Sequence, residues 1–222
     1  MENIASSFFT YDPISVILLL TVLGVAPFFL LMVTSFVKIV IVLGLVRNAL
    51  GTQQVPPNLV LNGLALIISM YIMAPVAKQT AIIAAEQSFS AHKIQELPEF
   101  LTTTGEPLRR FLYRHTSPRN RVFFLKAAAR IWPTAETEKL RGTDFLVLVP
   151  AFTVSELTTA FQIGVLLFLP FIAVDIVVSN VLMALGMMMM SPMTISLPFK
   201  LMLFVLVDGW SKLIEGLVLT YR

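Results

Sequence analysis

Hydrophobic and polar positions divide the 222-residue chain into an apolar part, a polar part and a second apolar part. Residues 1–81 hold five charged side chains and residues 145–222 hold seven, whereas residues 82–144 hold seventeen. Long apolar runs without the alternation of half-buried strands predict helices. We therefore predict an all-α protein with an N-terminal apolar helical hairpin over 1–81, a polar helical insert over 82–144 and a C-terminal apolar helical hairpin over 145–222.

The N-terminal apolar part contains two blocks separated by a turn. The first block, Pro13–Val46, has Lys38 as its single charge and predicts one long helix over 14–46. The second block, Asn48–Ala77, has no charged residue. Residues 47–51, Arg-Asn-Ala-Leu-Gly, are soon followed by two adjacent prolines, and this combination is typical of a turn.

Short amphipathic helices are predicted in the polar insert. Gly-Glu-Pro at 105–107 opens one helix that ends near His115, and Ser117-Pro118 opens a second that ends near Trp132. The simplest interpretation is a small helical cap with a solvated surface. Arg47, in the short hairpin turn, counts as cytoplasmic under the positive-inside rule, which favours a periplasmic insert.

The C-terminal apolar part also predicts two helical blocks. The third block runs from Pro150 to Gly186, and Ser155 is a candidate N-cap for its helix. The fourth block runs from about Thr194 to Val207 and then becomes amphipathic. Gly186 and a Ser-Pro pair flank a run of four methionines between the two blocks, which predicts a turn there.

The apolar blocks are too long to be simple membrane spans. A helix over 151–186 is about 54 Å long and a helix over 14–46 about 50 Å, whereas the hydrocarbon core of a bilayer is about 30 Å thick. Lys38 and Asp175 lie inside these blocks, and charged groups at such positions normally face protein or water. A chain of this size has little interior for them, so we expect other subunits to cover much of its apolar surface.

Four charged residues in the apolar parts are candidates for buried charge or for subunit contacts. They are Lys38, Glu156, Asp175 and Lys200. Three roles remain open for them: pairing within or between subunits, lining a conduit, or partial exposure at helix ends. Buried ion pairs are weak indicators of stability, and one sequence does not say which acid meets which base.

Composition argues against most catalytic and cofactor chemistry. Apolar residues make up 57% of the chain and charged residues 13%, with a mean hydropathy of +0.84. There is no cysteine, and only two histidines are present, so we expect no metal and no cofactor. The net charge of +3 is too small and too scattered for a nucleic-acid partner.

Other membrane functions find little support in the sequence. An intramembrane aspartyl protease could use Asp175 and Asp208, but neither lies in the Gly-x-Gly-Asp or Tyr-Asp setting of that class. A secondary transporter would need internal repeats, and the two apolar parts are not recognisably related. A stand-alone oligomeric ion channel or a small transporter remains the alternative function. We expect no catalytic residue and no enzyme activity.

Several motifs in both apolar parts resemble the SctR/FliP family of type III secretion and flagellar export proteins. They are Thr34-Ser35-Phe36-Val37-Lys38, Arg47-Asn48-Ala49-Leu50-Gly51, Gln53-Gln54-Val55-Pro56-Pro57-Asn58, Pro170-Phe171-Ile172-Ala173-Val174-Asp175, Gly186 to Pro192, Thr194-Ile195-Ser196-Leu197-Pro198-Phe199-Lys200 and Asp208-Gly209-Trp210. The resemblance covers about 150 residues and keeps motif order and spacing, while the 82–144 insert has no such motif. Met190-Ser191-Pro192 is more similar to the injectisome branch than to the flagellar branch.

The resemblance implies a place in a protein-export channel. Family members assemble as five copies with SctS-like and SctT-like subunits into a helical pore in the bacterial inner membrane, largely on its periplasmic side. It further implies contacts with SctU-like and SctV-like proteins, with the base of the needle or rod, with membrane lipid, and with unfolded protein substrates that pass through the pore.

A cluster of methionines lies at the predicted turn of the C-terminal hairpin. Six of the eleven methionines lie between Met183 and Met193. Their flexible thioether side chains adapt to irregular shapes, so a bare methionine run fits either core packing or a deformable constriction. In a family of channels, the second interpretation predicts a pore gate. The predicted gate residues are Met187, Met188, Met189, Met190 and Met193.

Overall fold

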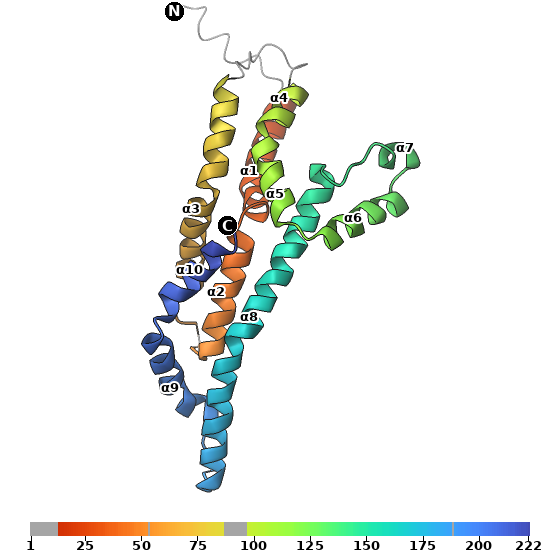
Figure 1. Cartoon of the computed structure of the whole chain (residues 1–222). Helices are drawn as coiled ribbons and strands as arrows, with labels where there is room; N and C mark the ends of the chain where they lie inside the picture. The colour runs from red at the N-terminus through yellow and green to blue at the C-terminus, as the bar shows by residue number, and fades with distance from the viewer. Residues whose placement is uncertain (1–12, 53, 87–96, 188) are drawn as a thin grey trace, which may run out of the picture.

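The computed structural model describes residues 13–52, 54–86, 97–187 and 189–222 (Figure 1). Within these ranges the chain forms ten helices and no strand. The helices are α1 (Pro13–Met32), α2 (Phe36–Leu50), α3 (Asn58–Glu86), α4 (Leu97–Thr104), α5 (Glu106–His115), α6 (Pro118–Ile131), α7 (Thr134–Thr137), α8 (Phe145–Ala184), α9 (Pro192–Leu206) and α10 (Gly209–Leu219). The prediction of an all-α protein is confirmed.

The first apolar block is broken between α1 and α2, so the prediction of one helix over 14–46 is wrong. Thr34 lies at the break and uses its side chain for backbone contacts. Its hydroxyl donates to the Leu31 carbonyl at 3.2 Å and accepts the Phe36 N–H at 3.4 Å. Such local bonds compete with the helical hydrogen-bond ladder, and they explain why the helix stops here without a proline or glycine.

Helix α2 lies in the middle of the molecule, with α3 on one side and α8 on the other (Figure 1). It ends at the predicted turn, where Gly51 has a φ of 77° and donates its N–H to the Asn48 carbonyl. The left-handed conformation is readily accessible to glycine, which makes it the usual residue after a helix end. The chain then returns antiparallel along α3, which extends to Glu86, past the expected end of the first part at residue 81.

Helix α8 is the longest element, with 40 residues and a length of about 60 Å. It begins at Phe145, with Asp144 in the N-cap position, and it continues through Pro150 and Pro170. The prediction that Ser155 caps this helix is therefore wrong. Ser155 lies inside α8 and is buried.

Helices α2 and α8 approach each other closely at Gly164. A Cβ atom added there would overlap the Leu45 side chain of α2, with Cβ and Cγ of Leu45 only 3.3 Å away. The absence of a side chain at this position therefore lets the two helices pack at short distance.

The C-terminal hairpin turns where the sequence predicts. Gly186 has a φ of 73°, and α9 starts at Pro192. A second break follows at Asp208, whose φ is 51°, and α10 then runs back toward the centre of the molecule (Figure 1). The aromatic ring of Phe204 packs so tightly against Gly209 that a Cβ there would overlap it.

The described part of the insert is helical and lies beside the upper half of the long helices. Helix α5 ends at His115 and α6 begins at Pro118, as the local proline signals predict. Helix α5 packs against α3 and α8, while the far end of α6 and α7 project away from the body of the molecule (Figure 1). The three-part division of the chain stays a prediction.

Two apolar clusters hold the helices together. The larger joins α2, α3, α8, α9 and α10 around fully buried residues such as Ile39, Val42 and Leu43. The smaller joins the break after α1 to α5 and α8 through Val33, Leu112, Leu148 and Phe152. The packing places α2, and Lys38 with it, at the centre of the structure.

Much of the apolar surface is uncovered within one chain. Among the described residues, the exposed large apolar side chains outnumber the buried apolar side chains by two to one. Helices α3 and α8 are long and apolar enough to cross a membrane, and α1 with α2 adds a third such element if the bent pair forms one span. Exposed apolar surface on this scale is typical of a protein that is covered by lipid or by other subunits.

Candidate functional site: two buried ion-pair clusters and a methionine turn

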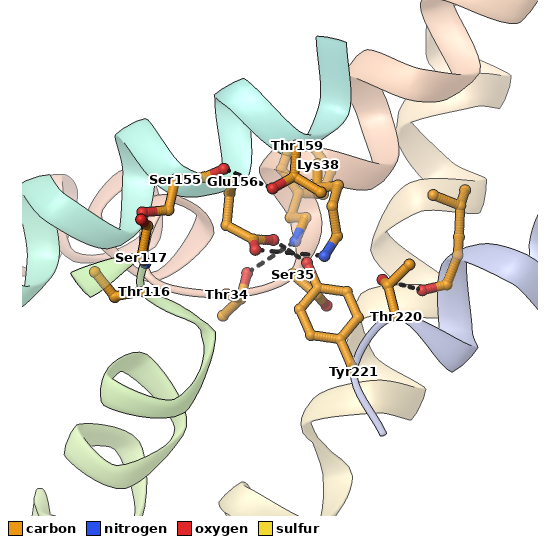
Figure 2. Close-up of polar contacts among 12 residues, drawn as sticks. Thr34, Ser35, Lys38, Thr116, Ser117, Ser155, Glu156, Thr159, Thr220 and Tyr221 are labelled. Carbon is orange, nitrogen blue, oxygen red and sulfur yellow. Dashed lines mark hydrogen bonds and ion pairs between the residues drawn. The ribbon is translucent and has the colours of Figure 1, made fainter. Parts of the chain in front are cut away.

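Lys38 of α2 and Glu156 of α8 form an ion pair in the middle of the molecule. The Lys38 Nζ lies 3.3 Å from the Glu156 Oε1, and both side chains are only 3% exposed. Tyr221, just after α10, completes the cluster (Figure 2). Its hydroxyl donates to the Glu156 Oε2, and its ring centroid lies 3.6 Å from the Lys38 Nζ. One buried cation is therefore neutralised by a carboxylate and also covered by an aromatic face.

Two aromatic residues of α5 cover Tyr221. The Phe111 ring stacks on the Tyr221 ring with centroids 5.9 Å apart, and the His115 ring meets it edge-on at 5.0 Å. The pKa of His115 is lowered to about 4, first by burial and then by the positive charges of Lys38 and Arg114. His115 is therefore uncharged at neutral pH and acts as an aromatic packing partner.

Tyr221 stays protonated in this setting. Burial, the nearby Glu156 carboxylate and the hydrogen bond to it raise the pKa of the Tyr221 hydroxyl above its usual value. The hydroxyl therefore acts as a fixed hydrogen-bond donor. The cluster ties α2, α5, α8 and the end of α10 to one point.

Buried hydroxyl groups extend this polar centre on both sides. Ser35 donates to Ser69 of α3 at 3.0 Å. On the other side, the Ser155 hydroxyl accepts the Ser117 N–H at 3.0 Å and an amide N–H of Asn120 at 2.8 Å, and itself donates to the Ala151 carbonyl. Ser155 thus connects the start of α6 to α8. This is its role in the structure, and it does not form the predicted N-cap.

A second ion-pair cluster lies nearer the methionine turn. Lys200 of α9 lies 2.6 Å from the Asp175 Oδ2 of α8 and also donates to the Ala49 carbonyl of α2 at 3.3 Å. Ser196 donates to the other Asp175 oxygen at 2.5 Å. The Lys200 side chain is 4% exposed and the Asp175 side chain 33% exposed, so this cluster fixes α8, α9 and the end of α2 from a less enclosed position.

The methionine turn lies at the far end of the α8–α9 hairpin, at the bottom of Figure 1. Met189 is fully exposed, and Met187, Met190 and Met193 are also exposed. Met188 lies outside the described residues. No other part of the described chain covers this turn, so its thioether side chains are available to lipid, to other subunits or to a passing polypeptide.

Asp175 and Asp208, the two aspartates that an intramembrane protease could use, have separate roles in the structure. Asp175 is engaged by Lys200 and Ser196, whereas Asp208 is exposed and accepts a hydrogen bond from Ser211 at 2.9 Å. The two carboxylates do not form the shared pair that an aspartyl protease needs. Among the described residues, no three His, Asp or Glu side chains group in a way that could hold a metal ion.

The four predicted charged residues thus meet in two pairs, and sequence reasoning missed the residues that complete each cluster. Tyr221 and His115 give no local signal, because an aromatic residue near a helix end has many ordinary roles. Ser196 lies four residues before Lys200, one turn away on the same helix face, and that spacing could have indicated it.

Comparison with protein families identifies the family to which the chain belongs. The FliP family model matches residues 19–217, a stretch that begins within α1 and ends within α10. The chain belongs to the FliP family. The resemblance predicted from the sequence motifs is confirmed at the family level.

Curated relatives match this FliP family member along almost its whole length. It is 51% identical to the pathogenicity-related ORF2 of Xanthomonas campestris pv. glycines, over 90% of this chain and 93% of the relative. It is 49% identical to the hypersensitivity response secretion protein HrcR of Ralstonia nicotianae, over 94% and 97% of the two chains. It is 48% identical to the Yop proteins translocation protein R of Yersinia pestis, over 95% and 97%.

Proposed function

We propose that this chain is a pore-forming core subunit of the export apparatus of a type III secretion system, of the injectisome branch. It passes unfolded proteins across the bacterial inner membrane from a position largely on the periplasmic side. The full-length similarity to proteins named for secretion and translocation supports this proposal. The working assembly contains five copies of the chain with SctS-like and SctT-like subunits, next to SctU-like and SctV-like proteins and the base of the needle or rod.

The observation on which the proposal depends most is the length and exposure of α8. The helix is about 60 Å long, twice the roughly 30 Å of a hydrocarbon core, and large apolar side chains are exposed along it from Leu146 to Met183. Lipid covers at most half of this length. The remaining apolar surface needs protein partners, as a subunit of a larger assembly provides.

The ion-pair clusters support a rigid subunit. They fix α2, α5, α8, α9 and α10 to one another at two points, one of them fully buried. The charged atoms are directed at each other, and three of the four side chains are almost fully buried, whereas the Asp175 side chain is 33% exposed. In this proposal the two clusters therefore hold the shape of the subunit and do not line the conduit.

The methionine turn is the gate of the proposed pore. Met187, Met189, Met190 and Met193 are uncovered at the end of the hairpin, and Met188 completes the run. One such turn from each copy forms an apolar ring. Apolar constrictions exclude ions by dewetting, and unbranched thioether side chains adapt to the varied shapes of a passing polypeptide.

The test uses the absence of cysteine from the chain. In a complex purified with cysteine-free partner subunits, Met189→Cys is expected to form disulfide-linked dimers of the chain and to crosslink to a stalled substrate protein. Ile131→Cys, also highly exposed but on the projecting α6, is the matched control and is expected to do neither. Absence of both crosslinks at Met189 in an intact complex would refute the central position of the turn.

The same preparation separates the proposal from a stand-alone ion channel. A secretion pore of the proposed kind requires its partner subunits for assembly and for ion leakage. If this chain alone, reconstituted into vesicles, conducts ions as well as the complete complex, the channel alternative replaces the export proposal.

A further inference from the structure

The methionine turn concentrates the side chains that an oxidant attacks most readily. The chain has eleven methionines and no cysteine, so thioether sulfurs are its main targets for reagents that transfer an oxygen atom. Met189 is fully exposed, and Met187, Met190 and Met193 are also exposed. An oxidant must reach the sulfur to react with it, and the turn presents four accessible thioethers between positions 187 and 193.

Backbone hydrogen bonds hold these side chains on one compact loop. The Met187 N–H donates to the Leu182 carbonyl at 2.9 Å, and the Met190 N–H donates to the Met187 carbonyl at 3.3 Å. The second bond joins residues three positions apart, as in a tight turn. None of the four methionines belongs to either apolar cluster of the core. A chemical change at their sulfurs therefore alters the surface of the turn and leaves the core of the chain intact.

Hydrogen-bond donors for an oxidised side chain lie in the same turn. Among the described residues, no hydrogen-bond partner is present for the Ser191 hydroxyl or for the Met193 N–H. A thioether sulfur is only a weak acceptor, whereas oxidation to the sulfoxide makes the side chain polar. The oxidised turn thus has donors of its own, even where water is scarce.

From this combination we infer that the methionine turn is a reversible oxidation site, and that its sulfoxide form opens the proposed gate to water and ions. The effect on the gate rests on the proposed function, whereas the oxidation itself depends only on the exposure of the turn. An apolar constriction excludes water and ions because its lining is apolar, and a sulfoxide removes that property. Met189 is the most exposed of the four and reacts first.

Hypochlorous acid serves as the oxidant that defines the reaction. The thioether sulfur attacks the oxygen of the acid, an S–O bond forms as the O–Cl bond breaks, chloride leaves, and the hydroxyl proton passes to water. Sulfur loses two electrons and chlorine gains them. Methionine sulfoxide reductases reverse the step with two electrons from a dithiol, which becomes a disulfide, and the sulfoxide oxygen leaves as water. The modification can therefore be set and reset.

The test oxidises the complete complex in detergent before its reconstitution into vesicles. Limiting hypochlorous acid is added, sulfoxides are located by mass spectrometry of peptides, and the ion leakage of the vesicles is measured. We expect Met189 to gain oxygen before Met32 and Met70, and the leak to rise toward that of a variant with glycine at positions 187–190. Treatment of the oxidised complex with methionine sulfoxide reductases for both epimers and dithiothreitol, before reconstitution, should restore the original leak.

Leucine variants make the effect specific to the turn. Leucine at positions 187–190 and 193 keeps the apolar volume and leaves no thioether in the turn, so oxidation of that complex should not raise the leak. Met32→Leu/Met70→Leu removes two exposed thioethers of α1 and α3 and should leave the oxidative leak unchanged. If the five-residue variant does not assemble, Met189→Leu takes its place and should reduce the oxidative leak.

Three outcomes overturn the inference. If Met189 stays unoxidised in the intact complex while Met32 and Met70 react, other subunits cover the turn. If the sulfoxide forms at Met189 and the leak does not rise, although the glycine variant leaks, the turn is a gate without a redox response. If the leucine turn leaks equally after oxidation, the change lies elsewhere in the complex. A glycine variant that assembles and does not leak refutes the gate, and the opening effect with it, even where peptide mapping records the sulfoxide.

Discussion

Tyr221 donates its hydroxyl to Glu156, a residue 65 positions earlier in the chain, and so brings the end of α10 into the buried centre of the molecule. The same ring covers the Lys38 cation at 3.6 Å. A tyrosine near the end of an amphipathic helix thereby becomes part of the contact between α2 and α8. The arrangement makes the C-terminal segment a structural component of the hairpin core.

The contributions of the Tyr221 ring and its hydroxyl can be measured separately. Tyr221→Phe keeps the cation–π contact but leaves one Glu156 oxygen without its donor, and it should lower the free energy of unfolding by about 1.5–3 kcal/mol. Tyr221→Ala also removes the ring and should be about 2 kcal/mol worse, because a desolvated cation–π contact is lost. Thermal unfolding of the detergent-solubilised chain measures both. Equal stability of the Phe and Ala variants would show that the ring over Lys38 contributes nothing.

The Lys38–Glu156 pair predicts strong energetic coupling between α2 and α8. Lys38→Met or Glu156→Gln alone leaves one charged or polar partner buried without its counterpart, and each should destabilise the chain by about 3–5 kcal/mol. The double variant Lys38→Met/Glu156→Gln should recover much of this loss, because no unpaired charge remains and the amide oxygen can still accept from the Tyr221 hydroxyl. Glu215→Gln, an exposed acid of α10, is the control and should have little effect. Additive losses in the double variant would contradict direct pairing.

Local signals predict part of this structure well, and distant contacts explain the rest. The prolines at 107 and 118 place the starts of α5 and α6 because they act within one turn of helix. The break at Thr34 was missed because its threonine and serine give no strong stop signal by themselves. Lys38 and Glu156 lie 118 residues apart, and four charges in apolar helices allow several pairings. Only the packing of α2 against α8 and α9 selects the two that form.

Acid should weaken the packing of α5 on the core through His115. Its pKa is lowered to about 4 by burial and by the charges of Lys38 and Arg114, against an ordinary value of 6.5 in the unfolded chain. The unfolded state therefore takes up the proton first, so the contribution of His115 to stability is complete above pH 6.5 and is lost progressively as the pH falls toward 4. The melting temperature of the wild-type chain should fall between pH 6.5 and 5.

His115→Gln removes the titrating ring and is the control for this pH effect. The variant should have a lower melting temperature at pH 7.5, since the contact with Tyr221 is lost, but its melting temperature should change less between pH 6.5 and 5. Identical pH slopes for the two proteins would assign the acid sensitivity to other groups.

The methionine turn predicts a leak when its side chains are removed. In the proposed pore, the exposed thioethers seal the channel, so replacing Met187, Met188, Met189 and Met190 with glycine should raise the ion leakage of vesicles that contain the complete complex. None of the four replaced residues belongs to either ion-pair cluster, so assembly should remain intact, which size-exclusion chromatography checks. Replacement of the same four residues with leucine keeps the apolar volume and should keep the seal, while its branched and less adaptable side chains should slow substrate passage. A glycine variant that assembles and leaks no more than the wild type would contradict the gate. A leucine variant that leaks as much as the glycine variant would show that apolar volume alone does not form the seal.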